Sequence, residues 1–434
     1  MKPMYDISVL MYLRRVAQHG LAATLIAMTL LPSAVAQPAA ETSQVDDSPL
    51  VHSSQITFAG IFEATLQHMP ETLISAALQH QAQSQTALGR RWITGAPTLE
   101  AAVVNDSLLS DKGLRELEAG VAVDLWRPGE RRAVQAAGAA YQQYSEAWDG
   151  YLRWLTAGHI REALAELERA DLQVAAAQAS RAEARRLLET TRTLQEAGAV
   201  SRLAVLQAES QWLQHDRQIL DAQAALADAE QHYTALTGLH ARPADAHQEN
   251  PVTTTVIPFD HPLLQLHDSE MRITESTIAQ SERDARGSPS LSIGLRRERG
   301  GWGDPHIDSI GVSVSVPLTS RAVVAASSAE ARTELSNAEV TRVLAMRDLT
   351  TRLLETRRAL TTVDNSLLLA QREYELNRQQ WEMAQTAFSA GEIDLTDVIL
   401  ALQRAQVSEY ELASLRLRHR HLASQYNQII GVLP

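Results

Sequence analysis

Histidines and carboxylates are the side chains of this sequence with the widest chemical scope, because it contains no cysteine. No two of its 14 histidines lie three or four residues apart, the spacings at which a helix directs two ligands to one metal ion. His419 and His421 are two residues apart and point in different directions on a helix. The sequence also lacks a G-x-S-x-G turn, a P-loop and an H-E-x-x-H helix. It therefore predicts a protein that is not an enzyme, with no catalytic residue, no metal site and no cofactor.

The polar residues that follow two glycines repeat one arrangement. Ser201 follows Gly198 by three residues and Asp394 follows Gly391 by three, and both residue types are good helix N-caps. Asp397 comes three residues after Asp394, in the first turn, where a carboxylate favours the helix dipole. In a symmetric oligomer Asp397 would also repeat around an axis, and a ring of acids favours cations over anions. Capping and cation selection both remain open for these carboxylates.

The two glycine turns belong to a tandem duplication. Landmarks recur in the same order at an offset of about 190 residues, which indicates two repeats of one unit. The matching landmarks are Pro97 and Pro289, Ala197-Gly198 and Ala390-Gly391, Tyr233 and Tyr426, and Gly238 and Gly431. We therefore predict a first repeat at 69–238 and a second at 261–434, with an N-terminal segment at 37–68 and a linker at 239–260.

Each repeat is expected to consist of a helix, a β-hairpin, a very long helix and a second helix. The long helices, at about 129–196 and 321–389, have almost no internal glycine or proline. Some 70 residues correspond to roughly 100 Å of helix. Each repeat also has a helix before its hairpin and a helix of about 40 residues after its glycine turn. Together these two nearly equal the long helix, so we expect both to lie antiparallel along it.

The hairpins, at 97–126 and 289–318, show the period-two alternation of half-buried strands. Ile310, Val312 and Val314, for example, alternate with glycine and serine. Strands of about 8–10 residues are near the length that crosses a bilayer. Four strands cannot stand alone in lipid, and membrane barrels begin at eight strands, so closure needs several copies, and a trimer would supply twelve. The alternative is a soluble coiled-coil protein with two surface hairpins.

The N-terminus predicts export. Arg14 and Arg15 precede a short apolar run at 21–31, and Ala34-Val35-Ala36 offers a cleavage site, so residues 1–36 are expected to be a cleaved signal peptide. Without cysteine the protein cannot carry a lipid anchor on that residue. The net charge of −13 argues against a nucleic-acid partner.

Taken together, these features resemble the TolC family of outer-membrane efflux proteins over about 58–433. The segments that carry the resemblance are the turn at 390–401, the strand at 312–318, the C-terminal 426–431 and the duplicated layout. The resemblance implies a mostly α fold with a small β part. Four strands per chain would join a trimeric, twelve-stranded outer-membrane β-barrel, continuous with a long periplasmic α-helical barrel. It also implies a homotrimer in outer-membrane lipid that works with a periplasmic membrane-fusion adaptor and an inner-membrane RND pump.

The segment Arg127-Pro128-Gly129-Glu130-Arg131-Arg132 resembles the Gly-x-Arg segment of the heavy-metal (Czc-type) branch. The implied function is a passive conduit that exports small solutes, with heavy-metal cations favoured over drugs. Multidrug efflux and type I secretion are alternatives with the same fold. A soluble periplasmic coiled-coil scaffold or adaptor is the alternative from another class.

The resemblance places the periplasmic entrance and the adaptor-docking tip at the two glycine turns. Phe388 occupies the aromatic position and Asp397 the acidic one, whereas Ala204, the counterpart of Asp397, is uncharged and Leu400 stands where a second acid can occur. A gate network of the family's best-known kind is therefore incomplete. The candidate entrance residues are Gly198, Ser201, Arg202, Phe388, Gly391, Asp394 and Asp397.

Overall fold

The computed structural model describes residues 49–245 and 247–434. The predicted signal peptide and residues 37–48 of the predicted N-terminal segment lie outside these ranges. Within them, none of the helices is sufficiently long and apolar to span a membrane.

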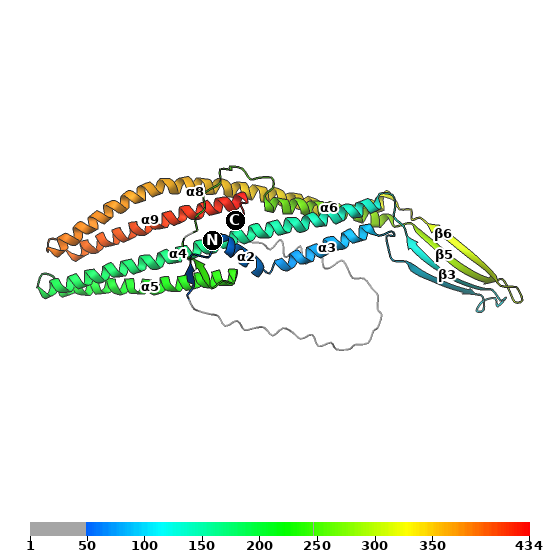
Figure 1. The fold of residues 1–434 in the computed structure, drawn as a ribbon, viewed down its shortest axis with the longest axis horizontal. Coiled ribbons are helices and arrows are strands. Elements are labelled where there is room, and N and C mark those ends of the chain that lie inside the picture. The colour runs from blue at the N-terminus through cyan, green and yellow to red at the C-terminus, as the bar shows by residue number, and fades with distance from the viewer. Residues whose placement is uncertain (1–48, 246) are drawn as a thin grey trace. The chain divides into compact units, whose positions relative to one another are not determined.

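The first repeat has the predicted order of elements. Its glycine turn falls between α4 and α5, which lie antiparallel (Figure 1). The predicted long helix is confirmed as α4, with 67 residues. Its elements are α3 (Thr72–Arg90), β2 (Thr98–Asn105), β3 (Arg115–Asp124), α4 (Glu130–Glu196) and α5 (Arg202–Thr237), and a further helix, α2 (Phe58–His68), precedes them.

The second repeat follows the same order, with one break that the sequence did not predict. Its elements are α6 (Pro262–Arg286), β5 (Ser290–Arg299), β6 (Ile307–Ser315), α7 (Arg321–Ser327), α8 (Ala329–Ser389) and α9 (Leu395–Ile430). The expected single helix is divided at Ser328, which is fully buried and bonds back to the carbonyls of Val324 and Ala325. Arg332 donates a hydrogen bond to the same hydroxyl. Such back-bonding by serine bends helices.

The long helices pack as the lengths suggested. In the first repeat α3 and α5 both pack on α4, and in the second α6 and α9 both pack on α8. The repeats meet where α4 contacts α6 and α9. The main helix contacts therefore follow the order α3–α4–α6–α8 near the sheet and α5–α4–α9–α8 near the glycine turns. In both orders α4 has helices on two sides, while α8 is at an end.

The two hairpins form one antiparallel sheet in the order β2-β3-β5-β6. The central pairing joins the repeats, with Val121 opposite Ile293 and Gly120 opposite Gly294. A methyl group added at Gly120 would lie 3.0 Å from the Ile293 carbonyl oxygen, so the strands approach closely there. The registers bring the alternating apolar residues of all four strands onto one face. That face includes the exposed side chains Leu99, Val121, Ile293, Leu295, Ile310, Val312 and Val314.

The other face of the sheet is polar and centred on Arg296. Its guanidinium lies 2.7 Å from a Glu298 oxygen, 2.9 Å from Glu116 and 3.5 Å from Glu118. The sheet therefore has one charged face and one face that is apolar up to the ion pair of Arg297 with Asp308 near the β5–β6 loop.

Each repeat closes with a tyrosine before its terminal glycine. Tyr233 donates a hydrogen bond to the Ala241 carbonyl, and Tyr426 donates one to the Thr254 carbonyl. Both phenol rings are buried in a hydrophobic cluster of their own repeat. Burial raises the pKa of Tyr233 to about 12. The landmarks that revealed the duplication are thus core residues.

The segments before each repeat contribute structure that was not predicted. β1 (Val51–Ser53) pairs in parallel with β4 (Ala241–Pro243), and Ile61 and Phe62 of α2 are buried against α4 and α5. These strands have three residues each, too short to show a periodic pattern.

A buried ion pair joins the linker to both repeats. Arg161 of α4 lies 2.8 Å from Glu249, and Asn427 of α9 donates to the same carboxylate. Burial alone would raise the pKa of Glu249, but the hydrogen bonds from His247, Arg161 and Asn427 and the charge of Arg161 lower it to about 2. The carboxylate is therefore ionised at neutral pH and holds three segments together.

Candidate functional site

The two glycine turns have the same backbone geometry. Gly198 and Gly391 have φ of 78° and 77°, in the left-handed region that favours glycine. The next residue in each turn donates across it, Ala199 to the Leu194 carbonyl and Glu392 to the Ala387 carbonyl. This six-to-one bond is the Schellman ending of a helix. The two repeats therefore share the same hydrogen bonds at their glycine turns.

The residues predicted as caps start the following helices in different ways. Ser201 accepts a hydrogen bond from the Ala204 amide at 3.4 Å, so its predicted capping role is confirmed. Asp394 occupies the N-cap position of α9, but its side chain makes no capping bond. Asp397 lies in the first turn of α9 with its side chain exposed. The carboxylates of Asp394 and Asp397 thus remain available to solvent and ions.

Phe388 is buried within the single chain. Its ring is 2% exposed and lies in a hydrophobic cluster between the helices. The cluster, here called the tip cluster, combines residues from the ends of α4, α5, α8 and α9. Its buried members are Leu187, Leu188, Ala204, Ala208, Trp381, Phe388, Leu395, Val398, Leu402 and Ala405. Because it contains residues close to both glycines, the tip cluster holds the two turns together at one level along the helices.

The two turns carry different charges. The second exposes three carboxylates within six residues, on Glu392, Asp394 and Asp397. At the matching positions after Gly198 the first turn has Ala199, Ser201 and the buried Ala204, and it exposes the cation Arg202. Beyond the glycines the site is therefore acidic on the second turn only, while the first turn exposes Glu196 before its glycine. Sequence reasoning missed Glu392, although its place beside Gly391 was a usable signal.

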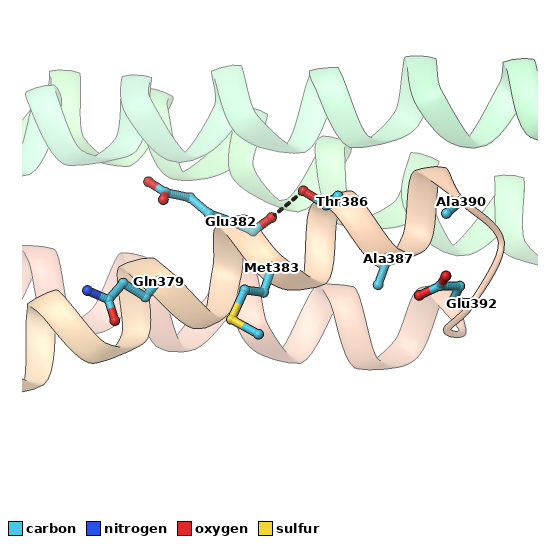
Figure 2. Close-up of a pocket in the computed structure, with 7 residues that line it drawn as sticks. All are labelled: Gln379, Glu382, Met383, Thr386, Ala387, Ala390 and Glu392. Atoms are coloured by element: carbon cyan, nitrogen blue, oxygen red, sulfur yellow. Dashed lines mark hydrogen bonds between the residues drawn. The ribbon is translucent and has the colours of Figure 1, made fainter.

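An open groove of about 650 Å³ lies along the end of α8 and reaches the second turn (Figure 2). Met383, Ala387 and Ala390 provide apolar lining, and the carboxylates of Glu382 and Glu392 flank it. Met383 is 73% exposed. The close-up shows its side chain on the outer surface of α8 (Figure 2). No sequence motif pointed to this groove.

The Gly-x-Arg segment lies at the opposite end of α4, beside the sheet. Gly129 is the N-cap of α4 with φ of 84°. Arg127 donates to the carbonyls of Gly287 and Pro317, and Arg131 donates to that of Gly89. The arginines therefore tie the bases of the hairpins to the helices.

Within 49–245 and 247–434 there is no group of three or more histidine, aspartate or glutamate side chains placed to hold a metal ion.

Comparisons with known proteins give structural matches alone, since no family model and no curated relative matches the sequence. The chain is similar to the outer membrane protein VceC of Vibrio cholerae, with a TM-score of 0.71 and 16% identity over 86% of this chain and 96% of that one. It resembles CusC, studied for its folding and transmembrane channel formation, with a TM-score of 0.69 and 14% identity over 90% and 95%. The CmeC outer membrane channel of Campylobacter jejuni matches at 0.65 and 15% identity over 95% and 94%.

These matches span nearly the whole of each neighbour and show the fold. It is the TolC-like channel fold, mostly helical with a small sheet, as the sequence predicted.

Proposed function

We propose that this chain is the outer-membrane channel subunit of a tripartite RND-type efflux system, a passive conduit formed by three copies. The observation that carries the proposal is the exposed apolar face of the sheet, which ends in the unpaired edges of β2 and β6. Such a face needs apolar surroundings, and each edge needs a partner strand. Twelve strands closed into a barrel within outer-membrane lipid would satisfy both needs.

Exposed tryptophans near both ends of the sheet support this placement. Trp92, shortly before β2, is 91% exposed, and Trp302, in the loop between β5 and β6, is 66% exposed. Tryptophan is enriched at both interfaces of membrane proteins, because its ring suits the boundary between lipid and water. The distribution favours a sheet that crosses the membrane over a soluble scaffold.

The helices would continue the conduit into the periplasm, where the turns at Gly198 and Gly391 would face an adaptor and a pump. Three copies would place Glu392, Asp394 and Asp397 three times around the axis. Rings of carboxylates favour cations. Heavy-metal cations are therefore the proposed cargo, and the energy for export would come from the partner pump.

Bilayer recordings test the channel directly. We expect the purified chain to form cation-selective pores in planar bilayers, and Asp397→Asn to shift the reversal potential in a salt gradient toward zero. Asp228→Asn, on the exposed surface of α5 far from the turn, is the matched control and should leave it unchanged. A protein that leaves membranes with salt alone and forms no pore would refute the proposal.

Growth tests identify the cargo. A deletion strain is compared with the restored strain across zinc, cobalt, cadmium, nickel and copper, and across a panel of drugs. Sensitivity confined to metals would support cation efflux. Sensitivity confined to drugs would overturn the metal assignment and keep the channel, and no phenotype would favour type I secretion.

A further inference from the structure

The sheet and the helices of the chain have two different edges. The outermost elements on one side are β2, α3 and α5, and those on the other are β6 and α8. α5 packs mainly against α4 and α2, and α8 mainly against α9 and α6. A row of packed elements with two different free edges can be extended by a second copy of the same chain, with one edge packed against the opposite edge of the neighbour.

Both edge helices carry an apolar stripe that the chain itself leaves uncovered. The stripes consist of Leu206, Leu213 and Leu220 on α5, and Leu369, Leu376 and Met383 on α8. Their side chains are between 43% and 73% exposed. Within each stripe the residues are seven apart, the repeat by which helices pair in left-handed coiled coils.

The members of the two stripes also lie at equal distances from the glycine turns, measured along the helices. Leu206 comes eight residues after Gly198, and Met383 comes eight before Gly391. The next members follow at 15 and 22 residues on both helices. The tip cluster holds the two turns at one level. A rotation about an axis parallel to the helices keeps that level, so each residue of one stripe would face its counterpart on the neighbouring copy.

The groove around Met383 fits the beginning of the neighbour's α5. Arg202 follows Gly198 by four residues, which places it at the height of Ala387, between the carboxylates of Glu382 and Glu392. Further from the turns, Arg217 would lie at the height of both Arg372 and Glu373, so charge favours no pairing there. The opposite charges are therefore those near the glycine turns, Arg202 on α5 and the carboxylates of Glu382 and Glu392 on α8, which pairing between copies would bring together.

We infer that the α5 stripe of one copy and the α8 stripe of a second copy form an antiparallel seam, with Leu206 on Met383, Leu213 on Leu376 and Leu220 on Leu369. The seam fills the groove at the end of α8. The inference rests on the proposed three-copy channel and names the residues that join its copies.

Disulfide cross-linking tests the seam, because the chain has no cysteine of its own. We expect Leu213→Cys combined with Leu376→Cys to give a three-copy species on oxidation that reduction reverses. Each single substitution should give none. Leu213→Cys with Met383→Cys is the matched off-register control, since seven residues displace the thiols by about 10 Å along the helix. That exceeds the Cα separation a disulfide spans, so its yield should be at least about fivefold lower.

The outcomes separate the seam from the channel. A higher yield for the off-register pair would overturn the pairing. Three copies by native mass measurement, with conducting pores but no cross-link, would overturn the seam, leave the channel intact and assign the groove to an adaptor. A cysteine-free parent that neither assembles nor conducts would refute the proposed function itself.

Discussion

The long helices α4 and α8 occupy equivalent positions in the two repeats and have opposite surroundings. α4 contacts helices of both repeats and buries side chains such as Trp148 and Ile160. α8 lies at an edge and exposes Leu368, Leu376 and Met383. The two repeats therefore contain one long helix in the core of the single chain and another that leaves apolar residues exposed at an edge. The difference between them is one of position and not of helix type.

The largest loss of unfolding free energy is expected from Ile160→Ala in α4. Ile160 is fully buried, and truncation of such a side chain leaves a cavity that costs about 2–5 kcal/mol of unfolding free energy. Leu376→Ala in α8 is the matched control and should cost less than about 1 kcal/mol in the single chain. Urea unfolding in detergent, under conditions where one copy is present, measures both. Equal losses would contradict the distinction between core and edge.

The next largest loss of unfolding free energy is expected at the ion pair of Arg161 and Glu249, which joins the linker to both repeats. Glu249→Gln leaves Arg161 buried beside a neutral amide, and the loss of one partner from a buried pair costs about 3 kcal/mol. Glu63→Gln, which removes the partner of the exposed Arg153, should cost less than about 1 kcal/mol. Thermal unfolding followed by circular dichroism compares the two. A loss of similar size at both positions would refute the role assigned to the buried pair.

The repeats should also differ in their response to acid, through the histidines beside their terminal glycines. Burial lowers the pKa of His261 to about 4, although Asp260 and the Ile429 carbonyl raise it in part. The unfolded chain, with a pKa near 6.5, binds the proton first, so stability is complete above pH 6.5 and is lost as the pH falls toward 4. The loss should amount to about 3 kcal/mol.

His261→Asn tests this assignment, because asparagine does not titrate and can still accept the bond that Nδ1 takes from the Leu263 amide. We expect a flatter profile of unfolding free energy between pH 7 and pH 4 than in the parent. His68→Asn is the matched control, since His68 lies beside Gly238 but is exposed. An unchanged profile in His261→Asn would exclude His261 as the source.

The smallest effect concerns the feature that the two repeats share. Gly198→Ala and Gly391→Ala should each cost about 1 kcal/mol, because alanine is strained at positive φ while no atom obstructs its methyl group. Gly150→Ala, within α4 and equally unobstructed, should stabilise the helix by up to about 1 kcal/mol. Melting temperatures measure all three. Unequal losses at the two turns would contradict their equivalence.

The sequence predicted the fold closely because its signals are long and periodic. Helices of 67 and 61 residues and strands of 8 to 10 residues show their period many times over. The break at Ser328 was missed, since it depends on the hydrogen bonds of one buried hydroxyl. The pairing of β1 with β4 was missed because it joins three-residue segments far apart in the chain.

The candidate site was predicted in part. The glycine turns, the cap at Ser201 and the exposure of Asp397 follow from local rules and agree with the structure. The burial of Phe388 could not be predicted, because an aromatic residue near a turn can point toward the core or away from it. The groove at Met383 depends on which helix ends at an edge, and that is a property of packing.

The pairing of β3 with β5 has a consequence for the order of folding. The antiparallel helices α4 and α5 are joined by a short turn, so they can associate as soon as residues up to 237 have emerged. The sheet must wait, because Arg115 pairs with Arg299 and Asp124 with Ser290, and the last strand ends at Ser315. We therefore expect α4 and α5 to associate before the four-stranded sheet is complete. The hairpin of β2 and β3 can pair locally, but the other edge of β3 stays unpaired until β5 has been synthesised.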